Sequence, residues 1–425
     1  LDTGLPVAAP PDTTPQINLA TNGSITVTET VGDLLAGHVH STGGDVTLFS
    51  PLRILDADGG ATIEVTGANI TMIAGTAGVQ GGIGLAGDFL EINVARDGST
   101  GVLNATDTQA PSTAGIYLDD LLGDMRVDTV HTTADVSLRT VEGSIVDGRT
   151  GASNDGAANV LGQAIDIDAN GGSGGTVALK IDSSRDSAAP TLDAGGDDVA
   201  LEAGDGIHLI ETDGTLRLVL AHAYTGNIVL GVRESLDVDE NFLLVHSGEA
   251  RFAESDSRLP GNDPDAPRDI DHGQVFAESG SVTIRAGDDI ALHANSEIVA
   301  SEGIDIYGDD GSIETGNGST ITLRGRLVAG AVVTAGDPVG SYVPSTAAPV
   351  HKANIWGNAD ADFIDFGDTA GSAGGTTWGD AGYIFIGSQT RVHGSADAES
   401  LVVDGEDRIR VFFLQDANVT TGPAT

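Results

Sequence analysis

The sequence predicts an all-β protein, a right-handed parallel β-helix (β-solenoid) that is nearly free of helix. One observation is the period of the side chains: aliphatic or β-branched residues alternate with polar ones in short stretches such as SITVT (24–28), DVTLF (45–49), TIEV (62–65) and TITLRGRLV (320–328). Each stretch ends in Gly, Asp, Asn or Ser, which favour turns. Alternation with period two is typical of strands that bury one face.

Helical periodicity is the second observation, because it is almost absent. Apolar residues almost nowhere keep a helical spacing for three turns. The one helical candidate is IYLDDLLGDMRV (116–127), which is short enough to be a turn or a distorted strand instead.

Self-similarity along the chain is the third observation. VALEAGDGIHL (199–209) and VTIRAGDDIAL (282–292) share the phrase VxφxAGDxIxL, and weaker copies begin at Val46 and Ile70. Units of two short strands and a bend cannot bury a face alone, but they can when they stack. At about twenty residues per coil the two main copies are close to four coils apart, and the chain would hold roughly fifteen to twenty coils. We expect these positions to be buried: Val199, Leu201, Ile207, Leu209, Val282, Ile284, Ile290 and Leu292.

Composition shifts divide the chain into four parts. Residues 1–21 form a Pro-rich lead or linker, and 22–329 form the β-helix rod. Within the rod, the acidic, Pro-containing run 254–271 is expected to be a projecting loop. Residues 330–350 read as a hinge or loop, and 351–425 as a second, RTX-like solenoid end whose motif is described below. The chain opens at Leu1 without Met or a signal sequence, as expected for a mature product or an excised piece.

Charge excludes several classes of partner. The 425 residues carry a formal net charge of −44, with only two lysines and no cysteine. No basic stripe exists to replace the counterions of a phosphate backbone, so nucleic acid is not expected as a partner. No stretch of about eighteen apolar residues is present, so insertion into a membrane is not expected.

Two kinds of repeat carry a resemblance to known proteins. The G[DS]VxLxA and AGDxI phrases over about 22–328 resemble those of filamentous-haemagglutinin-type large bacterial exoproteins, which implies right-handed parallel β-helices at an extracellular or cell-surface location. WGNADADFID (356–365) and HGSADAESLV (393–402) are similar to the calcium nonapeptide GGxGxDxφx of RTX exoproteins. In the first, Gly357, Asp362 and Ile364 match, but Asp360 stands where the motif has a glycine. The two copies are separated by about two coils, so they are not the tandem array in which adjacent coils share calcium.

One acidic stretch matches a calcium loop by spacing. Asp166, Asp168, Asn170 and Gly171 match the first half of an EF-hand loop, but the twelfth position is Val177, not the bidentate acid. Simple alternation explains the stretch as well, with the aspartates facing water. The pairs Asp56 with Asp58 and Asp237 with Asp239 carry the same two readings. Calcium is the one cofactor expected, and its first candidate ligands are Asp166, Asp168, Asn170, Asp360 and Asp362.

Other motifs that look chemical have simpler explanations. GxGxxG at 82–87 is followed by an alternating strand, whereas a dinucleotide site needs a helix there. GGSGG (171–175) reads as a turn and not as a nucleophile elbow. His38 and His40 would share one face of a strand, which a metal site could use, but an ordinary polar outer face is the simpler interpretation.

Three classes of function compete. A structural segment of a secreted bacterial fibre or adhesin fits best, because the sequence specifies a repeating rod and no catalytic signature. A carbohydrate-binding module, with surface polysaccharide as its partner, is the alternative, and a polysaccharide-active β-helix enzyme ranks below it. An enzyme is not expected. β-Elimination on an anionic polysaccharide needs a base at the abstracted proton and cations around the uronate, whereas this chain offers a net charge of −44 and only scattered arginines. A terminal apolar strand around Phe412 and Phe413, with no covering helix, predicts continuation into flanking repeats or head-to-tail stacking into a filament.

Overall fold

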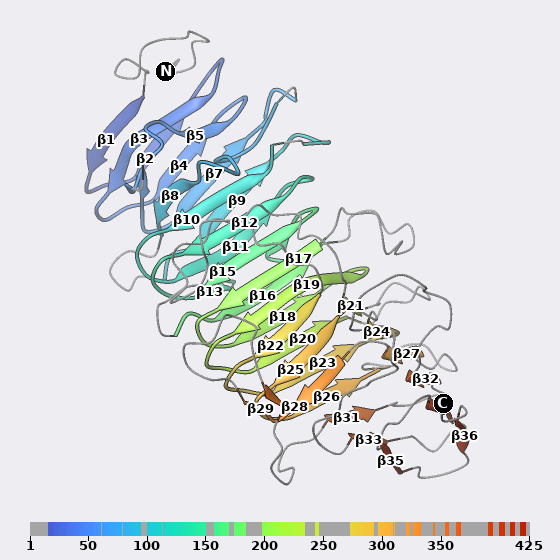
Figure 1. The fold of residues 1–425 in the computed structure, drawn as a ribbon. Helices are drawn as coiled ribbons and strands as arrows, with labels where there is room; N and C mark the ends of the chain where they lie inside the picture. The colour runs from blue at the N-terminus through green and yellow to red at the C-terminus, as the bar shows by residue number, and fades with distance from the viewer. Residues whose placement is uncertain are drawn as a thin grey trace. The chain divides into compact units, whose positions relative to one another are not determined.

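The fold was analysed in a computed structural model of the whole chain (Figure 1). The chain comprises two compact units, Leu1–Arg185 and Asp186–Thr425. The structure describes residues 16–60, 62–78, 80–94, 100–112, 114–149, 157–169, 174–183, 198–233, 243–245, 273–292, 296–308, 310, 320–323, 326–332, 343–344, 353–356, 363–366, 390–393, 399–403, 409–412 and 417–421.

The first unit is built from strands of two parallel sheets, which we name A and B in each unit. Its sheet A holds β1 (Ile17–Thr21), β3 (Leu34–Ser41), β5 (Ile54–Asp56), β6 (Val65–Thr66), β8 (Leu90–Asn93), β10 (Ile116–Asp120), β12 (Val136–Thr140) and β15 (Ile165–Ala169). Its sheet B holds β2 (Ile25–Thr28), β4 (Val46–Phe49), β7 (Ile70–Ala74), β9 (Leu103–Asp107), β11 (Met125–His131), β13 (Ile145–Asp147), β14 (Val160–Leu161) and β16 (Val177–Asp182).

The second unit repeats this plan. Its sheet A holds β17 (Asp198–Ala203), β19 (Leu216–Ala223), β21 (Leu243–Val245), β22 (Gln274–Ala277), β24 (Ile290–Leu292), β25 (Glu297–Ala300), β27 (Thr320–Leu323), β28 (Arg326–Ala329), β32 (Phe363–Phe366), β34 (Glu399–Val403) and β36 (Ala417–Thr421). Its sheet B holds β18 (Ile207–Glu211), β20 (Ile228–Val232), β23 (Val282–Ala286), β26 (Ile304–Tyr307), β31 (Ala353–Trp356), β33 (Thr390–His393) and β35 (Ile409–Phe412). The pair β29 (Ala331–Val332) and β30 (Val343–Pro344) is antiparallel.

The path of the chain alternates between the two sheets. In the first unit β2, β4, β7 and β9 pair in that order in sheet B, while β1, β3, β5 and β8 belong to sheet A. Each strand therefore pairs in parallel with a strand one turn further along the sequence. The expected all-β, helix-free character is confirmed for the described residues, and the parallel stacking is consistent with a β-solenoid.

Inward side chains stack in columns between the sheets. In the second unit Ile207 pairs with Ile228, Ile228 with Val282, and Val282 with Ile304. All four are buried. The eight positions that the repeated phrase predicts to be buried are buried without exception. Period-two alternation is therefore the pattern that builds this core.

The repeat register differs from the one expected. Val199 of the first copy lies on β17 in sheet A, whereas Val282 of the second copy lies on β23 in sheet B. The separation of the two copies is therefore not a whole number of turns. The phrase encodes a strand, a Gly-Asp bend and a second strand, and both sheets can use it because both bury alternate residues.

The length of a turn also varies. In sheet B the turn from Ile207 to its partner Ile228 is short, whereas the turn from Ile228 to its partner Val282 is more than twice as long. Insertions between strands account for the difference. In the described residues, sheet B shows seven successive layers in each unit. Sheet A shows seven in the first unit and eight in the second, when strands that pair with the same neighbour, such as β5 and β6, count as one layer. The sheet A count lies at the lower end of the roughly fifteen to twenty coils expected.

The helical candidate at 116–127 is wrong. Its residues form β10 and the start of β11, with Ile116, Leu118, Met125 and Val127 fully buried in strand alternation. Parallel neighbours on both sides pair with the backbone of β10, so tertiary contacts decide the local structure here.

Some strands lie inside the segments for which the sequence predicts a lead or a hinge. β1 begins at Ile17, inside the stretch expected as a lead, and β29 with β30 lies inside the stretch expected as a hinge. Strands after that stretch continue the ladders: β31 pairs with β26 and β32 with β27. The acidic run 254–271 lies outside the described residues. None of the described residues belongs to a helix that could cross a membrane.

We expect the column through Ile228 to control stability. Replacing Ile228 with Ala should lower the free energy of unfolding by about 2 to 5 kcal/mol, because a cavity would remain between its two stacked neighbours. The measurement is urea unfolding followed by circular dichroism. His208 lies in the adjacent strand but is exposed, so His208→Ala should change stability by less than about 0.5 kcal/mol. Equal effects of the two substitutions would contradict the assigned inward column.

Candidate metal centre

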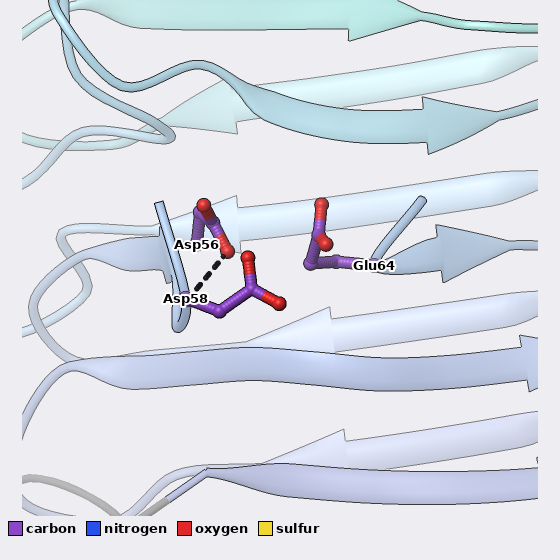
Figure 2. A group of neighbouring side chains, drawn as sticks. All are labelled: Asp56, Asp58 and Glu64. Carbon is purple, nitrogen blue, oxygen red and sulfur yellow. Dashed lines mark hydrogen bonds between the residues drawn. The ribbon is translucent and has the colours of Figure 1, made fainter. Parts of the chain in front are cut away.

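An acidic cluster lies in the first unit, where sheet A opens locally. β3 is continuous, but its first half pairs with β5 and its second half with β6. Ala36 and Val39 lie close together on β3, whereas their partners Asp56 and Val65 are separated by an insertion. The extra residues leave the sheet between β5 and β6. They bring Asp58 and Glu64 beside Asp56 (Figure 2).

Hydrogen bonds hold this insertion in shape. The Asp56 carboxylate accepts bonds from the backbone N–H groups of Asp58 at 2.9 Å and Gly59 at 2.6 Å, as in an Asx turn. Asp58 accepts one from Gly60 at 2.8 Å. The Thr62 hydroxyl lies 2.8 Å from Glu64 Oε1 and 3.4 Å from Asp58 Oδ2. The local turn chemistry therefore aims three carboxylates at one region.

The geometry of the cluster suits a cation. One ligand oxygen from each of Asp56, Asp58 and Glu64 lies within 4.8 Å of the other two. Asp56 and Glu64 are buried, while Asp58 is exposed to solvent. Figure 2 shows the Asp58 carboxylate between those of the other two residues. Three carboxylates in this arrangement could supply hard oxygen ligands to a divalent cation.

Two further carboxylates add to the negative charge. The backbone N–H of Glu64 donates to the carbonyl of Glu91 on β8 at 3.0 Å, so the two glutamates are neighbours across the ladder. Burial raises the pKa of Glu64 to about 7, and burial together with Glu64 raises the pKa of Glu91 to about 9. Burial, then the charges of Asp56 and Asp58, also raises the pKa of Asp88. Near neutral pH, Glu64 and Glu91 therefore hold at least one proton between them.

These glutamates belong to a column on the outer face of sheet A. The strand register places Glu91 beside Asp119, Asp119 beside Arg139, and Arg139 beside Asp168. All of these side chains are buried, although they alternate with the inward aliphatic residues. The Arg139 guanidinium lies over the ring of Phe89, 4.1 Å from its centroid. One buried cation thus lies among several acids.

Of the two aspartates singled out by sequence spacing, Asp168 belongs to this column, next to Arg139, and Asp166 lies beside Ser137 on the same strand pair. Asp166 and Asp168 on β15 are 2% and 1% exposed, so the interpretation of a water-facing pair is wrong. Ser137 donates a hydrogen bond to Asp166 at 2.7 Å. Arg139 lies 3.9 Å from Asp166 and 3.8 Å from Asp168.

The remaining calcium candidates, Asn170, Asp360 and Asp362, lie outside the described residues. Asp237 and Asp239 do as well. Calcium at these positions and at Asp166 and Asp168 stays a prediction.

The two histidines at 38 and 40 lie together on β3. Their ring centroids are 3.4 Å apart, and His40 Nε2 is 2.7 Å from the carbonyl oxygen of Ile63. Among the described residues, the one group with metal-ligand geometry is that of Asp56, Asp58 and Glu64, without either histidine.

The glycine motif has a structural role. Gly84 has φ +66°, and a Cβ there would collide with the carbonyl oxygen of Tyr117. The chain continues into β8, a strand, as the sequence indicates, and not into the helix that a dinucleotide site requires.

The second unit contains a different buried polar cluster. His222 on β19 is fully buried, with Nε2 2.9 Å from Glu278 Oε1 and Nδ1 3.7 Å from Glu202 Oε1. Its ring stacks on Phe276 at 5.4 Å and lies 4.2 Å from the ring of Tyr224. Burial alone would lower the pKa of His222, but the two glutamates outweigh burial and raise it.

Sequence reasoning missed Glu64, Glu91 and the His222 cluster for one reason. In TIEV the alternation correctly turns Val65 inward and Glu64 outward, but it carries no information about what covers the outer face. A signal is present at one position: Asp56 and Asp58 stand out as a pair, and the next acid along the chain, Glu64, completes the group.

Comparisons with known proteins give no relative. No protein-family model, no curated protein and no solved structure matches this chain.

We expect Glu91→Gln to stabilise the protein at high pH in the presence of a chelator. The raised pKa of Glu91 means that the folded state binds more protons, so stability falls as the pH rises from about 4.5 to 9. A neutral amide removes this penalty, and the gain should grow from near zero at about pH 4.5 to about 1 to 3 kcal/mol at about pH 8. Urea unfolding at both pH values measures it. The exposed Glu142→Gln is the control; an equal gain there would contradict the prediction.

We expect His222 to stabilise the second unit only when it is protonated. Because its pKa is raised above 6.5, its contribution is complete below about pH 6.5 and disappears as the pH rises through the folded-state pKa. The difference in unfolding midpoint between the native chain and His222→Gln should therefore shrink with rising pH. Tyr224, Glu202 and Glu278 face the ring and remain in both proteins. His208→Gln, at an exposed site, should show no such trend; a constant difference for His222→Gln would refute the prediction.

Proposed function

We propose that this chain is a structural segment of a secreted bacterial fibre or adhesin, located outside the cell or on its surface. In this proposal the stack is a right-handed β-solenoid, the hand that nearly all parallel crossover connections adopt. The observation that carries the proposal is the parallel stacking of successive strands in both sheets of each unit, seen throughout the described residues. A structure of this kind supplies length, stiffness and a repeated surface, and a catalytic role is not part of the proposal.

The net charge of the chain favours end-to-end association of copies over side-by-side association. The net charge of −44 opposes side-by-side association of copies, because lateral contacts would bring like charges together. Strand edges at the ends of a stack carry backbone donors and acceptors that charge repulsion leaves available. Association is therefore favoured along the stack, with flanking repeats or with further copies of the chain.

The first strand shows how such an edge could work. Within the described residues, β1 pairs only with β3. The Thr21 carbonyl accepts a bond from Thr42 N–H, so Thr21 directs its backbone groups toward the β3 side. Alternate residues of a parallel strand point in opposite directions, and Ala20 therefore presents its N–H and C=O to the outer edge. Stacking of another coil would use these groups.

We expect the full chain to form end-to-end assemblies at high protein concentration, visible by electron microscopy and sedimentation velocity. Ala20→Pro should suppress them without lowering the melting temperature, because proline removes an edge-facing N–H and no bond to β3. Leu19→Pro is the control on the same strand; its N–H faces β3, so it should also destabilise the end of the stack. Strictly monomeric native chain at every concentration would overturn the assembly part of the proposal.

A further inference from the structure

Sheet A of the second unit divides into two ladders at β19 (Figure 1). The first half of β19 pairs with β21, and that ladder continues through β24 and β27. The second half of β19 pairs with β22, and this ladder continues through β25 and β28. We call β22, β25 and β28 the side ladder. The second half of β19 is therefore where the side ladder joins the rest of sheet A.

The outer face of this junction changes from polar to apolar at one residue. The register places His222 on β19 between Glu202 on β17 and Phe276 on β22. From Phe276 the column continues along the side ladder through Val299 and Val328. All three of these apolar side chains are fully buried, as is His222. His222 therefore lies at the base of the side ladder.

Both ring nitrogens of His222 face carboxylates. Nε2 lies 2.9 Å from Oε1 of Glu278, the residue that directly follows β22, and Nδ1 lies 3.7 Å from Oε1 of Glu202. The backbone N–H of Glu278 also donates to the carbonyl of Ala223 on β19 at 2.9 Å. An imidazolium donates from both nitrogens, whereas a neutral imidazole donates from one and accepts at the other. A neutral ring would therefore direct a lone pair at one of the two carboxylates.

The groups around His222 decide which charge controls the junction. Among the described residues, the titratable groups that face the ring are Glu202 on β17, Glu278 after β22 and Tyr224 directly after β19. Two residues earlier on the same face, the register places three uncharged side chains, those of Ala200, Leu220 and Gln274. Burial opposes a charge on the ring, but the two glutamates outweigh burial and raise the pKa of His222 above its usual value.

We propose that His222 is a proton-controlled latch for the side ladder. The protonated ring ties β22 to β19 through Glu278, and loss of the proton weakens this tie, so that β22 separates locally from β19. Sheet B should stay paired, because β23 is bonded to β20 and β26 independently of His222. This local opening goes beyond the effect of His222 on overall stability, and it does not rest on the proposed role as a fibre or adhesin.

The experiment measures hydrogen exchange of the full chain by mass spectrometry at about pH 6 and about pH 9, after correction for the intrinsic exchange rate. Peptides that contain β22 report on the latch, and peptides that contain β23 or β26 of sheet B are internal controls. His222→Gln keeps a side chain that can form hydrogen bonds but cannot take up a proton. The matched control is His208→Gln, at an exposed position on β18.

We expect protection of the β22 amides in the native chain to fall, between the two pH values, at least about tenfold more than protection of the sheet B amides, as for a shift of about one pKa unit. His222→Gln should show low protection of β22 at both pH values, and His208→Gln should match the native chain.

Three results would each overturn the proposal. One is unchanged protection of β22 in the native chain, and another is an equal loss in both sheets, which would indicate global unfolding and not a local opening. The third is a β22-specific loss of the same size in His222→Gln. If circular dichroism shows that His222→Gln does not fold, Glu278→Gln replaces it, because it removes the carboxylate that Nε2 contacts. Glu278→Gln should reduce the pH difference in β22, and an unchanged difference would contradict the latch.

Discussion

In-register stacking of parallel strands is the constraint on which the rest of this structure depends. Neighbouring strands lie about 4.8 Å apart, so every side chain has a counterpart of the same orientation directly above and below it. In the core of each unit this stacking is favourable, because aliphatic residues such as Ile207 and Ile228 bury apolar surface against each other. The hydrophobic columns follow from it. So does the tolerance of turns of very different length, such as the short turn before Ile228 and the long one after it.

The same rule has the opposite effect on the outer face of sheet A. There it places Glu64 beside Glu91 and Glu91 beside Asp119, and it buries all three. Like charges at this spacing repel, and low exposure strengthens the repulsion. Two remedies are present in this chain: proton uptake by the glutamates and an arginine further along the column. The second unit uses a further remedy, since its equivalent column passes from Glu202 to His222 and then to Phe276.

Alternation along the strands was enough to predict an all-β fold and which residues of the repeated phrase are buried. The phrase at 199–209 and 282–292 determines which side chains turn inward, because that depends only on local period. It does not determine which sheet each copy occupies, because a strand, a bend and a second strand have the same sequence pattern whether the first strand belongs to sheet A or to sheet B. The insertion after Asp56 could not be predicted from the sequence either. It is recognised as an insertion only because β3, its partner strand, continues without interruption past both β5 and β6.

Candidate sites were predicted less well because sequence spacing describes one turn, whereas the sites span several. Asp166 and Asp168 satisfied a local ligand spacing, yet their surroundings come from Ser137 and Arg139, one turn earlier. Glu91 lies one turn after Glu64, at a sequence separation set by the insertions in that turn. In a stacked protein, chemistry therefore depends on the register between turns. A carboxylate in such a stack is best judged by the residue one strand away and not by the residue two positions along the chain.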